Sequence, residues 1–192
     1  MTDKRALRVR LRAVRAGFGP RPLVVPAPFR DRLAPGIVVA AYVPIGGEVD
    51  PAPLVEVARA AGGVIALPHV VDRATPIRFL AAEGALTDGP FGLRQPGADV
   101  PPLIPSIILT PLVGFDRRGN RLGQGAGHYD RAFMDCPAAW RIGVAWSVQE
   151  VPALTPDPWD VPLHAIITER EWIMPPAPVT PPPAPSARPL PR

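Results

Sequence analysis

The sequence has a single cysteine, Cys136, among its 192 residues. One cysteine excludes an internal disulfide and is typical of a reduced, intracellular setting. Apolar runs are also short, since none approaches the roughly 18–20 residues that span a bilayer. The charged N-terminal segment lacks the apolar core of a signal peptide. We therefore predict a cytoplasmic protein with no membrane partner.

Lysine is almost absent, with Lys4 as its one representative, so arginine supplies nearly all of the positive charge. The formal net charge is only +4. Arginine keeps its charge and binds phosphate or carboxylate in a fork, which favours anionic ligands. Because the net charge is mild and no aromatic stacking motif is present, we expect no nucleic-acid partner.

Hydrophobic residues make up 47% of the chain and charged residues 20%, in a length that suits one globular domain. We assign this domain to residues 1–174. Residues 175–192 are dominated by proline, which favours an extended chain and cannot build a core. They are predicted to form a disordered tail. The domain is expected to be a monomer or a weak homodimer.

The apolar pattern predicts strands that alternate with helices or loops. Helical spacing of Leu7, Leu11, Val14 and Phe18 predicts a helix over residues 4–18. Two further helices are expected over 54–61 and 129–134. Buried strands are predicted at 37–43, 64–68, 106–113, 140–146 and 164–168, with an edge strand at 77–80 and a long loop over 84–105. The fold class is therefore α/β, a three-layer, Rossmann-like single domain with a mostly parallel central sheet flanked by helices. Ligands bind such sheets beyond the carboxyl ends of the strands.

The most informative segment is the glycine-rich stretch from Arg121 to Arg131, with glycines at positions 123, 125 and 127. Glycine permits positive φ and lets an anion approach the main-chain N–H groups, which can form an anion-binding nest. A helix starting near Tyr129 adds a favourable dipole end. The spacing matches neither a Walker loop nor a dinucleotide-binding turn. A tight connection whose glycines only permit a turn is the alternative interpretation.

Residues 115–131 read F-D-R-R-G-N-R-L-G-Q-G-A-G-H-Y-D-R, and this stretch resembles the 5-formyltetrahydrofolate cyclo-ligase family. The family pattern is F-D-x-x-G-x-R-L-G-x-G-x-G-x-Y-D-R. Shorter family motifs follow in the right order: K-x-x-L-R at 4–8, Y-x-P-x-x-x-E-V-D at 42–50, P-x-V at 68–70 and T-E at 168–169. The resemblance covers residues 4–172.

The resemblance implies an enzyme that uses ATP and Mg²⁺ to convert 5-formyltetrahydrofolate into 5,10-methenyltetrahydrofolate, ADP and phosphate. Reduced folate and ATP would be its small-molecule substrates. The catalytic groups would be Lys4, Arg8, Arg121 and Tyr129. ATP would be bound by Lys4, Arg5, Arg8, Arg121, Leu122, Gly123, Gln124, Gly125, Ala126, Gly127, His128 and Tyr129. Folate would be contacted by Val43, Glu48, Gln124, Gly125, Ala126, Gly127, His128 and Trp146. The magnesium ligands would be Asp130, Asp160 and the residue at position 164.

The chain departs from the family pattern at three positions. His128 replaces a common tyrosine, and Ala126 stands where glycine or lysine is usual. His164 replaces an aspartate, and histidine is a poor ligand for a hard cation. Three alternatives follow for the metal site: Asp157 or Asp160 replaces the missing ligand, a water molecule fills its position, or activity is weakened. A non-catalytic folate- or nucleotide-binding protein with a degraded metal site is therefore the alternative hypothesis.

Two residue assignments also stay open. Taken without the resemblance, Glu48 reads as a loop carboxylate or a helix cap, and Trp146 reads equally well as a core residue. A module that binds RNA or a partner through the arginines of residues 5–15 is a third, less favoured reading.

Overall fold

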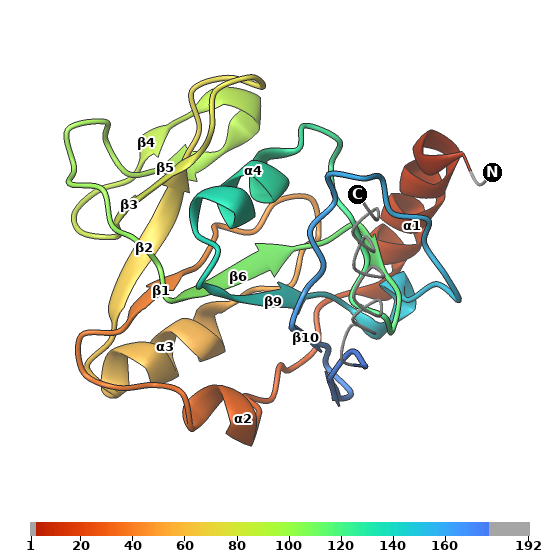
Figure 1. Cartoon of the computed structure of the whole chain (residues 1–192), viewed down its shortest axis with the longest axis horizontal. Helices are drawn as coiled ribbons and strands as arrows, with labels where there is room; N and C mark the ends of the chain where they lie inside the picture. The colour runs from red at the N-terminus through yellow and green to blue at the C-terminus, as the bar shows by residue number, and fades with distance from the viewer. Residues whose placement is uncertain (1–2, 177–192) are drawn as a thin grey trace, which may run out of the picture.

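The computed structural model describes residues 3–176, so the predicted disordered tail from residue 177 onward lies outside the described residues. Its centre is a seven-stranded sheet with the order β11-β10-β9-β6-β1-β2-β3 (Figure 1). The five inner strands are parallel to one another. They are β1 (Val38–Ala40), β2 (Val64–His69), β6 (Ile107–Pro111), β9 (Trp140–Val144) and β10 (Ala165–Ile167). The predicted α/β class with a mostly parallel sheet is confirmed.

The two edge strands run antiparallel to their neighbours: β3 (Arg78–Ala81) on β2, and β11 (Trp172–Ile173) on β10. The edge strand expected at 77–80 corresponds to β3. The strand β11 was not predicted, because two residues are too few to show an alternating pattern.

Helices cover both faces of the sheet. On one face lie α2 (Ala27–Arg30) and α3 (Ala52–Ala60), and on the other lies α4 (His128–Asp135), as Figure 1 shows. Phe29 and Leu54 belong to the apolar cluster on the first face, and Phe133 to the cluster on the second. The inner strands are therefore buried on both sides, which explains why they read as continuous apolar runs.

The first helix, α1 (Lys4–Phe18), has the predicted bounds and packs beside the sheet. Leu7 and Leu11 contact a small apolar cluster that includes Val113 and Leu122. Leu122 belongs to the hairpin of β7 (Gly114–Phe115) and β8 (Arg121–Leu122), which leads directly into the glycine-rich segment. This packing fixes α1 next to that segment.

The long loop predicted over 84–105 contains secondary structure. Strands β4 (Thr87–Asp88) and β5 (Arg94–Gln95) pair antiparallel, joined through the 3-10 turn η1 (Pro90–Gly92). A second such turn, η2 (Ser147–Gln149), follows β9. Glycine and proline dominate the sequence around the β4–β5 hairpin, so its short strands were hidden in a loop-like composition.

The turn between β7 and β8 is organised by Asp116, which is fully buried. Its carboxylate accepts hydrogen bonds from the N–H groups of Arg118 (3.0 Å), Asn120 (3.1 Å) and Leu154 (2.8 Å). The Asn120 side-chain amide donates a fourth at 2.9 Å. Buried donors that lose a charged acceptor are costly, so this residue holds the hairpin in shape.

We expect Asp116→Ala to lower the free energy of unfolding by about 3 kcal/mol, because four donors lose their acceptor inside the protein. Urea denaturation followed by circular dichroism measures the effect. Asp88→Ala is the control, since Asp88 is exposed and its ion pair with Arg94 lies at the surface; that variant should change stability by less than about 0.5 kcal/mol. Equal effects of the two substitutions would contradict the assigned role of Asp116.

Candidate functional site

A cavity of about 590 Å³ opens beyond the carboxyl ends of β1, β2 and β6. This is the position expected for a ligand on a parallel sheet. Its lining comes from parts of the chain that are far apart in the sequence. It comprises Lys4, Arg8, Arg12, Tyr42, Val43, Ile45, Glu48, Pro68, Val70, Arg73, Ile77, Phe91, Leu93, Arg94, Pro111, residues 121–130, Asp157, Trp159 and Asp160. The cavity thus brings together most of the predicted site residues.

The segment from Gly123 to Gly127, called the glycine loop below, crosses the middle of this cavity. Gly125 has φ +102° and Gly127 has φ +68°, a left-handed conformation that caps the start of α4. L-residues rarely adopt such angles, which accounts for glycine at both positions. No backbone hydrogen bond among the described residues uses the N–H groups of residues 123–127. The loop therefore presents free N–H donors next to a helix N-terminus, as an anion-binding nest does.

Arginine side chains hold the carbonyl groups of this loop. Arg8 donates from Nε to the Gly123 carbonyl oxygen at 2.8 Å, and Arg131 donates to the Ala126 carbonyl oxygen at 3.1 Å. Because a peptide's carbonyl and N–H point in opposite directions, fixing the carbonyls orients the N–H groups as well. Ala126 itself keeps a negative φ, so replacing the family's glycine or lysine introduces no strain there.

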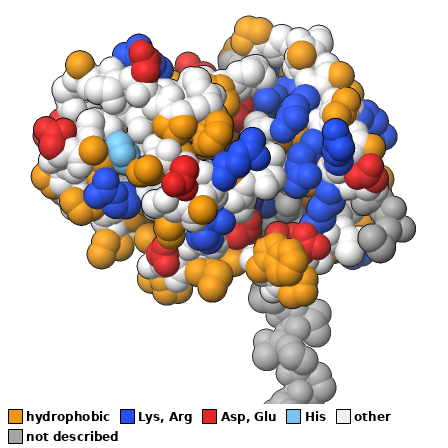
Figure 2. All heavy atoms as spheres, turned by 90° about the horizontal axis from the view of Figure 1, so that it is seen from above, with side chains coloured by type: hydrophobic (Ala, Val, Ile, Leu, Met, Phe, Trp, Pro, Cys, Tyr) orange, Lys and Arg blue, Asp and Glu red, His pale blue; other side chains and the backbone are white. Residues whose placement is uncertain are grey.

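One face of α1 supplies the cations. Lys4, Arg8 and Arg12 are spaced four residues apart, so they lie on one side of the helix, and all three line the cavity. Arg12 also donates from Nε to the Gln124 side chain at 3.1 Å. Figure 2 shows Lys and Arg side chains gathered in a band on the side of the molecule where α1 lies. The predicted site residue Arg5 is exposed and is not part of the lining, because it points away from this face.

At the polar end of the cavity, Lys4 is paired with two carboxylates. Its Nζ lies 2.7 Å from Asp157 and 3.1 Å from Asp160. Burial lowers the pKa of Lys4, but the hydrogen bonds to these two aspartates outweigh it, so the pKa is raised overall. Lys4 is therefore a firmly charged group at the cavity wall.

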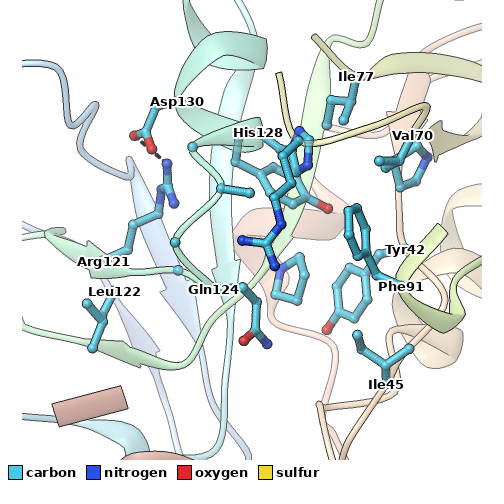
Figure 3. Close-up of a pocket in the computed structure, with 18 of the residues that line it drawn as sticks. Tyr42, Ile45, Val70, Ile77, Phe91, Arg121, Leu122, Gln124, His128 and Asp130 are labelled. Carbon is cyan, nitrogen blue, oxygen red and sulfur yellow. Dashed lines mark hydrogen bonds and ion pairs between the residues drawn. The ribbon is translucent and has the colours of Figure 1, made fainter. Parts of the chain in front are cut away.

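Arg121 and Asp130 form a second ion pair at this end, drawn in Figure 3. Both side chains are largely buried. Asp130 also accepts the N–H of Val161 at 3.2 Å. The Asp130 carboxylate is therefore fixed beside the first turn of α4, where the helix dipole favours a negative charge.

The predicted magnesium set is not brought together. His164 is absent from the cavity lining, and its ring nitrogens lie 3.0 Å from the backbone N–H and 2.9 Å from the guanidinium of Arg141. Within residues 3–176, no group of three or more His, Cys, Asp or Glu is close enough to hold a metal ion. His164 directly precedes β10, so it lies at the amino ends of the parallel strands, whereas the cavity lies beyond their carboxyl ends. This position explains its separation from Asp130 and Asp160.

The remaining donors still fit magnesium. Asp130, Asp157 and Asp160 all line the polar end of the cavity. Mg²⁺ is commonly held by one or two carboxylates together with substrate phosphates and water, so a complete protein cage is not required. The substitution at position 164 therefore does not remove the carboxylates that face the cavity.

Glu48 lies near the end of the cavity that is remote from Lys4 and Asp130, and its side chain is only 5% exposed. It accepts the N–H of Ile45 at 3.2 Å and the side-chain amide of Gln124 at 3.4 Å. Arg15 of α1 approaches it to 3.7 Å. Burial raises the pKa of Glu48, while the Ile45 N–H and Arg15 act in the opposite direction. Glu48 is thus a buried acceptor at the cavity wall.

Beyond Glu48 the lining becomes apolar. Figure 3 shows Tyr42, Ile45, Val70, Ile77 and Phe91 around this recess, opposite the Arg121–Asp130 pair. Burial raises the pKa of Tyr42 far above its usual value, and its hydroxyl donates to the Val49 carbonyl at 2.7 Å. The phenol therefore stays neutral and contributes a flat surface.

Sequence reasoning missed Phe91 and Trp159. Phe91, in the β4–β5 hairpin, is the one non-glycine residue among those described with a positive φ, at +61°. Trp159 is 65% exposed although it lines the cavity. Each lies in a stretch that reads as loop, and no local pattern distinguishes a lining aromatic from a solvent-exposed one.

Val43 lines the cavity as predicted, but Trp146 does not. Trp146 is buried, its ring centroid lies 5.8 Å from that of Phe18, and its Nε1 donates to the Gly47 carbonyl at 2.9 Å. The core alternative is thus the correct placement for Trp146, because the β9 strand end directs this side chain under the 46–48 segment. It supports the backbone that carries Glu48.

His128 and Tyr129 open α4 and line the cavity. Burial and the neighbouring Arg131, 3.2 Å from Nδ1, lower the pKa of His128. Burial, reinforced by Glu48, raises the pKa of Tyr129. Both side chains are therefore neutral at physiological pH.

The fold and the cavity together define a class of ligand-binding α/β protein. A parallel α/β sheet carries a nest of free N–H groups, flanked by fixed cations and carboxylates, that continues into an apolar recess with one buried carboxylate. These groups are of the kinds that suit a polyanion at one end of the cavity and an apolar, hydrogen-bond-donating ligand at the other. No helix within residues 3–176 has the length and apolar character needed to cross a membrane.

The chain belongs to the 5-formyltetrahydrofolate cyclo-ligase family, whose sequence model matches residues 31–169. The protein is therefore an enzyme of this family. It is 33% identical to the 5-formyltetrahydrofolate cyclo-ligase of Escherichia coli K12 over 150 residues, which cover 70% of this chain and 80% of that protein. It is 32% identical to the enzyme of that name from Mycolicibacterium smegmatis over 152 residues, 72% of this chain and 77% of that protein.

Solved structures agree with the sequence comparison. A 5,10-methenyltetrahydrofolate synthetase from Aquifex aeolicus superposes with a TM-score of 0.67 at 26% identity, over 89% of this chain and 92% of that one. The corresponding protein from Mycoplasma pneumoniae gives 0.64 at 26% identity, over 88% and 99%.

We expect Gly125→Ala to weaken inorganic tripolyphosphate binding roughly tenfold, because alanine at this φ costs about 1–2 kcal/mol in the conformation that presents the N–H groups. Isothermal titration calorimetry measures it. Gly84→Ala is the control: Gly84 also has a positive φ, +75°, with open space around it and no part in the cavity. Weakening of equal size in both variants would show that the glycine loop is not the anion site.

Proposed function

We propose that the enzyme uses ATP to cyclise 5-formyltetrahydrofolate to 5,10-methenyltetrahydrofolate, releasing ADP and phosphate. The observation behind the proposal is the continuity of the glycine loop with the apolar recess in one cavity. A triphosphate on the loop and a reduced folate in the recess would meet over residues 124–128. Family membership supports cyclo-ligase activity independently.

The triphosphate would lie on the free N–H groups of the glycine loop, between Lys4 and Arg8 of α1 and Arg121. Nests, helix N-termini and Arg or Lys side chains together are the usual phosphate ligands of proteins. Trp159 offers an exposed flat face at this same end, next to Asp157 and Asp160, and would suit the nucleotide base. The polar end of the cavity thus offers groups that suit the phosphates and the base of a nucleotide.

The folate would occupy the apolar recess. Glu48 would accept hydrogen bonds from the amine and ring N–H groups of the pterin, since an ionised carboxylate is a strong double acceptor. Tyr42, Ile77 and Phe91 would contact its rings, as apolar and aromatic walls do in small-molecule sites. This orientation points the formyl group toward the glycine loop.

The chemistry requires a better leaving group on the formyl carbon. The formyl oxygen attacks the γ-phosphorus and ADP departs, which leaves an activated imidate-like carbon bearing phosphate. The second folate nitrogen then attacks that carbon, the ring closes, and phosphate leaves with the former formyl oxygen. The protein needs no covalent nucleophile. Its residues align the two substrates and neutralise developing negative charge, which are the main contributions to phosphoryl transfer.

Magnesium would be held by one or two carboxylates of the polar end, either Asp130 or the Asp157–Asp160 pair, together with phosphate oxygens and water. A bound divalent cation supplies Lewis-acid stabilisation of phosphate charge. For Asp157 and Asp160 to take that role, Lys4 must transfer its contacts from these carboxylates to the phosphates. Lys4 lies at the cavity wall and has the flexible stem for such a change.

An absorbance assay tests the reaction directly. The methenyl product is conjugated and absorbs in the near ultraviolet, where the formyl substrate does not. Purified protein with 5-formyltetrahydrofolate, ATP and Mg²⁺ should produce that band, and omission of ATP or of Mg²⁺ should abolish it. No band, with both ligands still bound in calorimetry, would instead establish the non-catalytic binding protein.

Replacing the buried carboxylate should affect only the folate. We expect Glu48→Gln to raise the KM for 5-formyltetrahydrofolate about 10–100-fold, since hydrogen bonds to a charged group contribute about 1.5–3 kcal/mol, while the KM for ATP stays nearly constant. Steady-state kinetics measures both KM values. The control variant is Glu56→Gln, because Glu56 is exposed on α3. An unchanged folate KM would remove Glu48 from the folate site.

The same residue predicts a pH dependence. Because burial raises the pKa of Glu48, its charge is lost as the pH falls, earlier than for an exposed carboxylate. The folate KM of the wild-type enzyme should therefore rise on acidification, and this rise should be absent in Glu48→Gln. Parallel pH profiles for the two proteins would show that another group titrates.

Asp130→Asn should reduce kcat by on the order of 100-fold or more, because a neutral amide is a far weaker ligand for Mg²⁺ than a carboxylate. Asp135→Asn, at the exposed end of the same helix, is the matched control and should keep full activity. Full activity of Asp130→Asn at limiting Mg²⁺ would exclude Asp130 from the metal site.

A further inference from the structure

Arg15, near the end of α1, is buried although nothing in its sequence context predicts this. Its side chain is only 4% exposed, and one guanidinium nitrogen, Nη1, donates to the Leu112 carbonyl at 3.1 Å. The same nitrogen lies 3.7 Å from Glu48 Oε1. Arg15 is not part of the cavity lining, whereas Lys4, Arg8 and Arg12 on the same helix are. It therefore acts from behind the cavity wall.

A buried guanidinium is a costly choice for packing alone. The free-energy cost of taking a charge out of water is offset only by well-placed partners. Proteins in which a buried ion pair is replaced by apolar residues are often as stable or more stable. Within residues 3–176, Arg15 Nε has no hydrogen-bond partner, so the contacts described are not optimised for stability. A role in holding Glu48 explains why a charged residue lies here.

The contact also includes the backbone that carries Glu48. A Cβ placed on Gly46 would lie 3.5 Å from the Arg15 guanidinium, so this turn rests against the arginine. Gly46 and Gly47 both have positive φ, +53° and +79°. The Arg15 side chain thus contacts the turn as well as the carboxylate at its end.

Among the described residues, the other polar groups around Glu48 provide no second fixed cation. Gln124 and the Ile45 N–H are neutral donors, and the phenols of Tyr42 and Tyr129 are neutral groups whose ionisation Glu48 opposes. Asp50 follows in the same segment with a like charge. Arg12 lies one turn from Arg15 but is bound to Gln124. Arg15 is consequently the cation that stabilises the charged form of Glu48.

We propose that Arg15 is a positioning residue, which keeps Glu48 ionised and aimed into the cavity, so that one helix serves both substrates. Lys4 and Arg8 of α1 would contact the nucleotide, and Arg15 would act on the folate through Glu48. The folate part of this inference rests on the proposed function. Its electrostatic part concerns the free protein and can be measured without a ligand.

The first test is a carboxyl titration of the free protein. In protein carrying ¹³C-labelled glutamate carboxyls, the Glu48 resonance is assigned by its loss in Glu48→Gln. We expect Glu48 to titrate at higher pH in Arg15→Met than in wild type, because the opposing cation is gone while the side-chain volume is nearly kept. Arg15→Lys should retain a titration close to wild type. Arg10→Met, at an exposed position of the same helix, is the control and should change nothing.

The second test is the pH dependence of folate affinity. Calorimetry with 5-formyltetrahydrofolate should show about tenfold or greater loss for Arg15→Met at neutral pH, recovering as the pH rises and Glu48 ionises. ATP affinity should be unchanged. If the loss is the same at every pH, Arg15 only shapes the pocket and the proposal is wrong.

The two tests separate the two claims. An identical Glu48 titration in wild type and Arg15→Met overturns the role of Arg15 whatever the substrate is. A wild-type protein that binds no folate rejects the proposed function, while the titration still decides the role of Arg15. Should Arg15→Met fail to fold, Arg15→Gln keeps a donor for the Leu112 carbonyl without the charge and replaces it in both experiments.

Discussion

The glycine loop, the proposed anion site, depends on other side chains that hold its carbonyl groups. Arg8 and Arg131 bind the carbonyl oxygens at its two ends, and the positive φ of Gly125 and Gly127 completes the turn. The N–H groups of residues 123–127 are then left without a backbone acceptor in the part of the chain that the structure describes. A loop of this composition without those arginines would have many conformations, and ordering it on binding would reduce affinity. The cavity therefore depends on α1 being fixed beside the β7–β8 hairpin.

This arrangement explains why the proposed phosphate and folate sites are adjacent. The helix α1 lies along the cavity, with Lys4 at the polar end and Arg15 behind Glu48. Gln124 of the glycine loop connects α1 to Glu48, because its side chain accepts from Arg12 and donates to Glu48. Two ligands bound to one rigid wall are held in a fixed orientation relative to each other. A reaction between a formyl oxygen and a phosphoryl group requires such alignment.

Much of the fold could be predicted from the sequence, because buried parallel strands read as apolar runs and α1 has a regular helical period. The glycine loop, Glu48 and Asp130 were singled out from motif and resemblance, and all of them line the cavity. The sequence left Trp146 and His164 open, since their side-chain directions depend on strand ends and on neighbours such as Arg141. Arg15 was missed because its contact with Glu48 joins distant parts of the sequence. Phe91 lies in a hairpin with two-residue strands, and Trp159 lies in a stretch that reads as loop.

The most direct test of a single shared cavity follows the formyl oxygen. With ¹⁸O placed in the formyl group of 5-formyltetrahydrofolate, a single turnover with ATP is run and the released phosphate is examined by ³¹P NMR. Transfer of one ¹⁸O atom into phosphate is the predicted result, because the formyl oxygen attacks the γ-phosphorus and leaves with it. Unlabelled phosphate, alongside methenyl product, would show that the two substrates do not react in the arrangement described.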